Sequence, residues 1–337
     1  MTDSTDLLLQ PGAPETISGQ RYFLIRPVNQ FIELASKRPN PNELFGSLLM
    51  QGEVVILFSD TNLGKSILAV QIGNSVSHGT PVPGFKYEGG AMNVLYIDCE
   101  LSDKQFQARY TGDDGSTYRF SEKFFRAEID ADFFSENEVN EDSIIKHIED
   151  AIQQVNAKVV ILDNISVLCS RLEEAKSAAP LMMRLKQLTR RLNITLLTLA
   201  HTPKRDSTRP ITKNDLAGSR RLMDYADSAF ALGESQQGSA VRYIKQIKTR
   251  SSQEKYGSEN IIVCNILKDI CFLQLRFVGF DEERNHLKPI TDEYRAARVE
   301  DAGKMKAQGY SHQRIADHFG VTEGAVRKWL GKKGTNE

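Results

Sequence analysis

Residues Val54 to Gly79 read V-V-I-L-F-S-D-T-N-L-G-K-S-I-L-A-V-Q-I-G-N-S-V-S-H-G, and this run contains the strongest structural signal in the chain. An apolar run typical of a β-strand, Val54–Phe58, leads into a polar loop, and Gly64-Lys65-Ser66 then opens an amphipathic helix. The backbone N–H groups of such a loop bind phosphates, a lysine reaches the outer phosphates, and a serine hydroxyl holds Mg²⁺. The run therefore predicts a nucleotide-binding loop, with contacts expected from Ser59, Asp60, Thr61, Asn62, Leu63, Gly64, Lys65, Ser66 and Ile67.

One position departs from the phosphate-loop pattern G-x-x-x-x-G-K-[ST], which has glycine where this chain has Ser59. A small residue does least harm at this first position, whereas Gly64 lies where the chain must turn tightly. The alternative is an ordinary helix N-terminus with a solvated lysine. The strand at the right distance and the apolar helix positions that begin at Ile67 and Leu68 favour the nucleotide-binding interpretation.

Length and composition set the class of protein. The 337 residues suffice for an α/β core and an appended domain, and 40% hydrophobic with 26% charged residues is ordinary for a globular protein. A formal net charge of −1 gives no general basicity, so any contact with nucleic acid would be local. The four scattered cysteines predict neither disulfides nor a metal site. With an acidic N-terminus and no apolar run of membrane-spanning length, we expect a cytoplasmic protein.

Strand-like and helix-like segments alternate along most of the chain, which predicts an α/β fold with a mainly parallel sheet covered by helices on both faces. From Ser228 onward, consecutive strand-like runs predict antiparallel hairpins at one edge of the sheet. The expected domains are a flexible tail (1–20), a nucleotide-binding α/β domain (21–288) and a small all-α domain (289–337). Helices are expected at 31–37, 102–110, 141–155 and 174–192, and strands at 54–58, 93–98, 124–129, 159–163, 194–200, 229–232, 241–249, 261–266 and 271–280.

Two strand ends carry acids that could complete a nucleotide site. The apolar run V-V-I-L-D ends in Asp163, where a carboxylate can support a metal held by Ser66; a loop-capping aspartate is the alternative. The run N-V-L-Y-I-D-C-E ends in Asp98 and Glu100, and a carboxylate there can orient or deprotonate an attacking water. A helix N-cap is the alternative at this second end, and it suits Asp98 or Ser102 better than Glu100.

The phosphate loop, Y-I-D-C-E-L-S, V-V-I-L-D-N-I-S and L-L-T-L-A-H-T-P-K-R together resemble the RecA-type ATPase core. They are most similar to the branch of hexameric replicative helicases of the DnaB and plasmid RepA kind, often met as AAA-family ATPases of mobile elements and prophages. The resemblance implies an ATP hydrolase that uses ATP and Mg²⁺, with Glu100 as the catalytic glutamate and Asp163 as the metal-associated acid. It also implies that His201 senses the γ-phosphate, a position where the RecA pattern commonly has glutamine. A structural histidine at a strand end is the alternative.

A basic pair, Lys248 and Arg250, follows the strand-like run that starts at Val241. Ring-forming RecA-type ATPases insert such a pair into the ATP site of the neighbouring subunit, where it acts as an arginine finger. Because alternate residues of a strand share a face, both side chains are expected to point the same way. An exposed basic strand end is the alternative. If the family role applies, the protein acts as a homo-oligomer, for example a hexameric ring.

The segment Thr202–Ala217 is basic and rich in turn-forming residues. In the family, a loop at this place lines a central pore and touches single-stranded DNA, so the resemblance implies phosphate contacts from Lys204, Arg205, Arg209 and Lys213. A mobile surface loop without DNA contact is the alternative.

The C-terminal run S-H-Q-R-I-A-D-H-F-G-V-T-E-G-A-V-R-K-W-L, preceded by an amphipathic helix at 292–307, resembles a helix-turn-helix. Apolar residues occupy its core positions, namely Ile315, Phe319, Val321, Val326 and Trp329. The second helix would present Thr322, Glu323, Arg327 and Lys328 towards a groove or the phosphates of duplex DNA. The alternative is a helical module that docks a protein.

These features together predict a DNA-dependent ATPase, helicase-like or translocating, that acts in the replication or mobilisation of a plasmid, phage or integrative element. Its core would bind single-stranded DNA and its C-terminal domain duplex DNA. Two alternatives remain open: an ATP-switched DNA-binding regulator without unwinding activity, and an ATPase that remodels a protein partner.

Overall fold

The structure is a computed structural model, and it describes residues 23, 25–129, 140–170, 179–202, 205–216, 220–319 and 321–331. The chain divides into an N-terminal unit that ends at Asn40 and a second unit from Pro41 to Glu337. The N-terminal unit contains helix α1 (Val28–Ser36), whose apolar and polar residues separate to opposite sides. The second unit contains the sheet and all other described helices.

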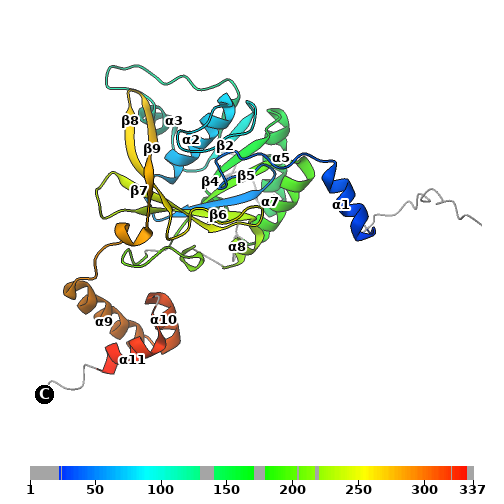
Figure 1. Cartoon of the computed structure of the whole chain (residues 1–337). Coiled ribbons are helices and arrows are strands. Elements are labelled where there is room, and N and C mark those ends of the chain that lie inside the picture. Colours follow the sequence, from blue (N-terminus) through cyan, green and yellow to red (C-terminus); the bar gives the residue numbers. More distant parts are fainter. Residues whose placement is uncertain are drawn as a thin grey trace, which may run out of the picture. The chain divides into compact units, whose positions relative to one another are not determined.

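Within the described residues, the second unit is organised around a nine-stranded sheet with the order β3-β2-β4-β5-β1-β6-β7-β8-β9 (Figure 1). The strands are β1 (Val54–Ser59), β2 (Val94–Asp98), β3 (Phe124–Glu128), β4 (Val159–Asp163), β5 (Thr195–His201), β6 (Ser228–Glu234), β7 (Val241–Lys248), β8 (Ile261–Asp269) and β9 (Phe272–Asp281). Strands β1 to β6 are parallel to one another, and β7, β8 and β9 add antiparallel neighbours at one edge. The predicted fold class is confirmed: an α/β domain with a mainly parallel sheet and antiparallel strands at one edge.

The antiparallel hairpins predicted from Ser228 onward are confirmed, because β6 pairs antiparallel with β7, β7 with β8, and β8 with β9. On its other side β6 pairs in parallel with β1, with Ser228 opposite Val55. Strand β6 therefore joins the parallel and antiparallel parts of the sheet. The sequence did not predict this parallel pairing, because a strand-like run has the same local pattern in either direction.

Helices cover both faces of the sheet because apolar residues of its central strands point to both sides. One apolar cluster contains Leu68 and Ile72 of α2, and the other contains Ile144, Ile148 and Ile152 of α5. The three isoleucines recur every four residues, which places them on one face of their helix. The helices of this part are α2 (Lys65–His78), α3 (Asp103–Arg109), α5 (Glu141–Gln154), α6 (Ile165–Ser170), α7 (Ala179–Leu192) and α8 (Arg220–Tyr225), with short 3₁₀ turns at Lys213–Asp215 and Glu283–His286.

The predicted helices agree with the observed ones to within about three residues, but two short helices, α6 and α8, were not predicted. Ser102 caps α3 through a reciprocal pair of hydrogen bonds with Gln105, as its position before a helical run predicts. The helix expected at 174–192 is described from Ala179, and residues 174–178 lie outside the described part of the chain. Helix α6 was not predicted, because six residues are too few to give a periodic signal.

Three helices form the C-terminal segment: α9 (Asp292–Ala307), α10 (His312–Phe319) and α11 (Glu323–Gly331). They enclose a small apolar cluster of their own, made of Ala302, Ile315, Ala316, Phe319 and Val326. The Arg298 guanidinium lies over the rings of Phe319 and Trp329, at 5.3 and 5.0 Å from their centroids, and closes one side of the cluster. Among the described helices, none is long and apolar enough to cross a membrane.

Candidate nucleotide-binding site

The loop between β1 and α2 has the backbone of a phosphate-binding loop. Gly64 adopts a left-handed conformation, with φ of +101°, and a Cβ at this position would lie 3.0 Å from the Ile266 side chain, so glycine is required. Ser59 instead lies in extended backbone at the end of β1 and pairs with His201 of β5. The serine therefore occupies a position where this chain needs no glycine, and its departure from the pattern does not disturb the loop.

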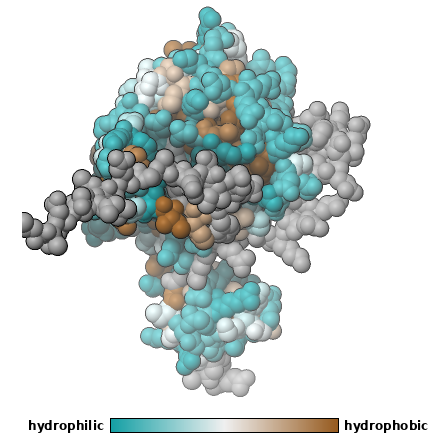
Figure 2. Space-filling view, turned by 90° about the vertical axis from the view of Figure 1, so that its right-hand side faces the viewer, coloured by the Kyte–Doolittle hydropathy of each residue, from teal (hydrophilic) through white to brown (hydrophobic). Residues whose placement is uncertain are grey.

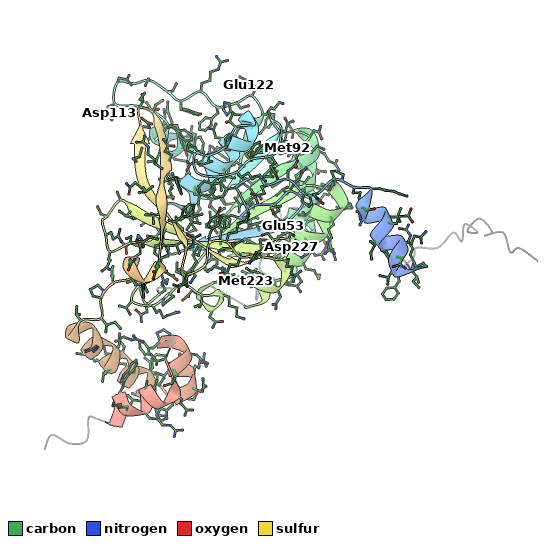
Figure 3. The ribbon with its side chains drawn as sticks, in the orientation of Figure 1. Glu53, Met92, Asp113, Glu122, Met223 and Asp227 are labelled. Atoms are coloured by element: carbon green, nitrogen blue, oxygen red, sulfur yellow. The ribbon has the colours of Figure 1, made fainter. Side chains whose placement is uncertain are left out.

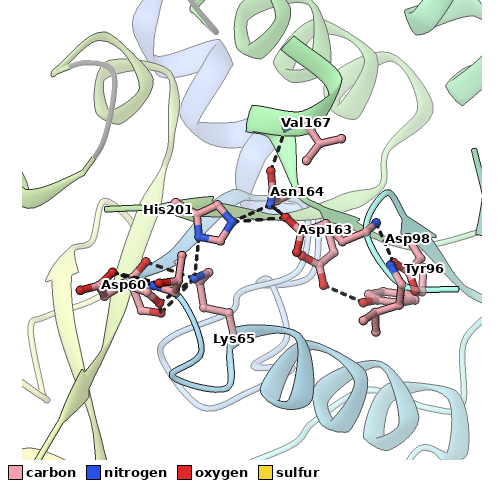
Figure 4. Close-up of polar contacts among 12 residues, drawn as sticks. Asp60, Lys65, Tyr96, Asp98, Asp163, Asn164, Val167 and His201 are labelled. Atoms are coloured by element: carbon pink, nitrogen blue, oxygen red, sulfur yellow. Dashed lines mark hydrogen bonds and ion pairs between the residues drawn. The ribbon is translucent and has the colours of Figure 1, made fainter. Parts of the chain in front are cut away.

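Lys65 is the first residue of α2, and its side chain folds back over the loop. Its ammonium donates hydrogen bonds to the carbonyl oxygens of Ser59 and Asp60, at 3.1 and 2.9 Å, and to the Ser59 hydroxyl at 3.1 Å. Its Nζ also lies 3.1 Å from Nδ1 of His201 (Figure 4). The lysine thus connects the loop to the end of β5.

Burial controls the charge of this lysine. Desolvation lowers the pKa of Lys65 from its ordinary 10.5 to about 8, although the nearby carboxylates of Asp163, Glu100 and Asp60 act in the opposite direction. The ammonium form is therefore favoured at neutral pH. A phosphate group placed beside it would replace part of the lost hydration.

A cavity of about 380 Å³ opens beside the loop. Its lining combines the loop, the start of α2 and the ends of three parallel strands, namely residues Thr61, Asn62, Gly64, Lys65, Ser66, Ile67, Glu100, Arg109, Asp163 and His201. The sequence prediction named all of these residues except Arg109. Ligands of α/β sheets bind at this carboxyl edge of the strands, because helix N-termini and strand ends meet there.

Glu100, after β2, faces the cavity together with His201. Its Oε1 lies 3.3 Å from Nε2 of His201 and accepts a hydrogen bond from the amide of Asn164. The hydrogen bond with His201 is the main cause that lowers the pKa of the Glu100 carboxyl, and it outweighs the effect of partial burial. Glu100 is therefore a carboxylate near neutral pH, the form that a general base requires.

Asp163 is buried at the end of β4, where Oδ2 accepts a 2.6 Å hydrogen bond from the Tyr96 hydroxyl. Burial raises the pKa of the Asp163 carboxyl, and hydrogen bonds from the hydroxyls of Ser66 and Tyr96 oppose that shift. A divalent cation beside this carboxylate and the Ser66 hydroxyl would stabilise the ionised form, so the two side chains fit a Mg²⁺ site. The described residues contain no cluster of three or more metal-ligating side chains. A nucleotide-bound Mg²⁺ does not need one, since phosphates and water supply most of its ligands.

Asp98, the other acid after β2, has a structural role. Its Oδ1 accepts hydrogen bonds from the backbone N–H groups of Glu100 and Leu101 at 3.1 and 2.9 Å, and Oδ2 pairs with Arg126 at 2.9 Å. The carboxylate therefore shapes the turn that presents Glu100 to the cavity. Of the two acids that the sequence left open, Glu100 is the one that lines the cavity.

Three residues of the site were missed by the sequence analysis. Arg109 lines the cavity from α3, and its Nη1 is a buried donor without a hydrogen-bond partner among the described residues. Arg242 of β7 donates from Nε to the carbonyl of Leu63 at 3.1 Å and so supports the loop from behind. Asn164 holds Glu100. Local patterns do not identify such residues, because each acts across elements far apart in the sequence.

The basic pair lies far from this cavity in the same subunit. Strand β7 is antiparallel to β6, and Lys248 pairs with Ala229 at the start of β6. Since β6 is parallel to β1, Lys248 and the following Arg250 lie at the amino edge of the parallel strands, whereas the phosphate loop leaves from the carboxyl edge. The pair therefore cannot serve the nucleotide site of its own subunit.

The contacts of the pair are local. Strand β7 ends at Lys248, one residue earlier than expected, yet both side chains reach the end of α8. Lys248 donates to the carbonyl of Ala226 at 2.8 Å, and Arg250 lies 3.5 Å from the carboxylate of Asp227 and is half exposed. Figure 3 labels Asp227 beside Met223 and Glu53 at this edge. Burial lowers the pKa of Lys248.

The predicted DNA contacts of the core differ in their surroundings. Arg209 forms a two-pronged ion pair with Asp215, at 2.5 and 3.2 Å, and Arg205 donates to the carbonyl of Arg209. Lys213 is exposed, and Lys204 lies outside the described residues.

In the C-terminal segment, the predicted DNA contacts lie on α11 and at its start. Thr322 caps α11, with its hydroxyl 3.2 Å from the N–H of Ala325, and Arg327 and Lys328 are exposed.

Of the comparisons with known proteins, the match to a protein family agrees with this geometry. No curated protein sequence matches the chain. A solved KaiC-like protein from the hyperthermophilic archaeon Pyrococcus horikoshii OT3 is similar at 14% identity and a TM-score of 0.47, over 67% of this chain and 90% of that one. Among protein families, the AAA domain family AAA_25 matches residues 24–207. The match includes the phosphate loop, Glu100 after β2, and the strands that end in Asp163 and His201. Because it covers more than half of the chain, the chain belongs to the AAA_25 family of AAA domains.

Proposed function

We propose that this protein is a DNA-dependent ATPase, helicase-like or translocating, that works in the replication or mobilisation of a plasmid, phage or integrative element. The observation that supports hydrolysis best is the convergence of Lys65, Glu100 and Asp163 on one cavity beside a phosphate-binding loop. A nucleotide-binding protein without turnover needs no carboxylate that faces the γ-phosphate position.

In the proposed reaction, the loop amides and Lys65 bind the β- and γ-phosphates of ATP. Glu100 accepts a proton from water while the water oxygen bonds to the γ-phosphorus and the bond to the bridging oxygen breaks. His201 contacts the γ-phosphate from the end of β5. Mg²⁺ held by Ser66 with the support of Asp163 would neutralise phosphate charge.

Charge developing on the γ-phosphate needs a further cation. Lys248 and Arg250 lie at the opposite edge of the sheet, so in a head-to-tail assembly they could reach only a neighbouring subunit's site. This supports a homo-oligomer, such as a hexameric ring, in which the pair acts in trans.

Two features support DNA as the partner. The segment from 205 to 216 follows β5, the strand that ends at His201, so a change at the γ-phosphate can be transmitted through His201 to this segment. Lys213 in this segment is exposed and available for a phosphate contact. The three C-terminal helices expose Arg327 and Lys328 on α11, the helix that would enter a groove. In Figure 2, the lower lobe formed by these helices has a mainly hydrophilic surface on the face shown, which suits a phosphate backbone better than an apolar docking partner.

The deciding experiment measures the ATPase rate alone, with single-stranded DNA and with duplex DNA, together with the oligomeric mass. A motor of the proposed kind is stimulated by single-stranded DNA and is oligomeric when active. Stimulation by one specific duplex only would favour the ATP-switched regulator. Absence of any DNA effect, with a variant lacking residues 322–333 fully active, would favour the protein remodeller.

A further inference from the structure

We infer that Asn164 is a positioning residue for Glu100, which fixes Oε1 of the carboxylate so that Oε2 faces the attacking water. The inference rests on the proposed function, since it specifies how the general base of that reaction is held. Asn164 follows Asp163 directly and is completely buried, and it is not among the residues that line the cavity. Its effect on the reaction must therefore pass through another side chain.

The orientation of the Asn164 amide is determined by the backbone. Its Oδ1 accepts a hydrogen bond from the N–H of Val167 at 3.0 Å, so the NH₂ group must lie on the other side of the amide. That NH₂ group donates to Oε1 of Glu100. If the amide were flipped, its oxygen would face Oε1 of Glu100 and its NH₂ group would face the N–H of Val167, so both hydrogen bonds would be lost.

The ring of His201 lies against the same two groups. Its Nε2 is 2.9 Å from Nδ2 of Asn164 and 3.3 Å from Oε1 of Glu100, while its Nδ1 is 3.1 Å from the Lys65 ammonium. The ring and the Asn164 amide therefore meet at the same carboxylate oxygen.

This convergence makes the two oxygens of Glu100 unequal. Oε1 accepts a hydrogen bond from the Asn164 amide and lies beside Nε2 of His201, whereas Oε2 has no hydrogen bond within the part of the chain that the structure describes. A general base must present a free lone pair in a fixed direction, because small errors in the placement of a reacting group cost large factors in rate. Asn164 would thus affect the turnover number much more than nucleotide binding.

A purely structural role is the alternative to test. The Asn164 side chain also caps α6 through Val167, and loss of that cap would destabilise the fold. Serine and aspartate are equally good caps, but neither has an amide N–H to donate to Glu100. The variants Asn164→Ser and Asn164→Asp therefore keep the cap and remove the contact, and the second also places a negative charge beside the carboxylate.

We expect Asn164→Ser to lower kcat by at least about tenfold with KM for ATP within about twofold of wild type, and Asn164→Asp to lower kcat further. In a Glu100→Gln background, Asn164→Ser should cause little further loss of turnover, because the group that it positions is already gone. In nucleotide-free protein, the losses in Tm of Asn164→Ser and Glu100→Ala should not add in the double variant.

Two outcomes separate this inference from the proposed function. If Glu100→Gln loses turnover but both Asn164 variants keep the wild-type kcat, or if the Tm losses are additive, the positioning role is wrong and the proposed function stands. If Glu100→Gln itself keeps wild-type turnover, the proposed function fails, and the positioning role fails with it.

Discussion

Ser59 and His201 are register partners at the carboxyl ends of β1 and β5, and the Ser59 carbonyl accepts a 2.9 Å hydrogen bond from the N–H of the next residue, Thr202. This register fixes the start of the phosphate loop against the end of β5. It brings Nδ1 of His201 within 3.1 Å of the Lys65 ammonium, although the two residues are 136 positions apart. The histidine is thus connected to the phosphate-binding lysine on one side and to Glu100 on the other.

From this relationship we expect His201→Ala to lower kcat by about 10- to 100-fold with a smaller effect on nucleotide affinity, because the side chain that connects Lys65 to Glu100 is lost and Glu100 is held less firmly. His201→Gln should keep more activity, since its amide has both an acceptor and a donor. Steady-state kinetics of the two variants provide the measurement. Equal losses in both would show that the imidazole itself is needed, and no loss in His201→Ala would contradict a role in turnover.

A second prediction concerns Glu100. The Glu100→Gln variant should bind ATP with near wild-type affinity while turnover falls by about 10²- to 10⁴-fold, the usual contribution of a general base. Fluorescent-nucleotide binding and phosphate release measure the two quantities. The matched control is Glu128→Gln, an exposed glutamate on the neighbouring strand β3 that pairs with Arg126 and lies outside the cavity lining. Wild-type turnover in Glu100→Gln would remove this residue from the mechanism.

The charge of Lys65 leads to a prediction about pH. A lowered pKa of about 8 means that the ammonium persists below pH 8 and is lost progressively above it. Affinity for ATP should therefore be flat from about pH 6.5 to 7.5 and fall above pH 8, approaching tenfold per pH unit as the protonated fraction declines. Calorimetric titration with a non-hydrolysable ATP analogue between pH 6.5 and 9.5 measures this profile. Lys123→Ala, which removes an exposed lysine outside the cavity, should keep it, and an affinity that is constant to pH 9.5 would contradict the assignment.

Much of this site follows from the sequence because strand ends and loops are local features. An apolar run followed by Gly64-Lys65-Ser66 predicts a strand, a loop and a helix in that order, and parallel strands bring Glu100 and Asp163 to the same edge. The loop, both acids and His201 could be named for this reason. The Ser59 departure was harmless because β1 is still extended at that residue.

The rest depends on contacts between distant elements. Arg242 donates to the carbonyl of Leu63, which is 179 positions away in the sequence. The sequence on either side of Arg242 is that of an ordinary strand and gives no sign of this contact. Asn164 differs from a loop asparagine only because β2 and β5 bring Glu100 and His201 to it. Arg109 belongs to a short helix whose direction relative to the cavity is a tertiary property. No periodicity or motif within these segments indicates such contacts.

The last prediction concerns Lys248 and Arg250, which lie at the edge of the sheet opposite to the phosphate loop. If they complete a neighbour's site, Arg250→Ala subunits have an intact cavity but supply no finger, and Lys65→Ala subunits have the reverse defect. Each variant alone should be nearly inactive, since loss of an arginine finger costs about 10³ or more in kcat. Mixing the two should restore part of the ATPase rate, because some interfaces then combine an intact Lys65 with an intact Arg250.

The control for this experiment is a mixture of Lys65→Ala and Glu100→Gln subunits. These two residues line the same cavity of one chain, so mixing cannot assemble a complete site from them. Restoration in the first mixture and not in the second would establish action in trans. The first mixture could also fail to restore activity even though mass measurement shows that both variants co-assemble. That outcome would mean that the basic pair makes only its local contacts with the Ala226 carbonyl and Asp227. The cation for the γ-phosphate would then come from another residue, and Arg109 is an arginine that lines the cavity.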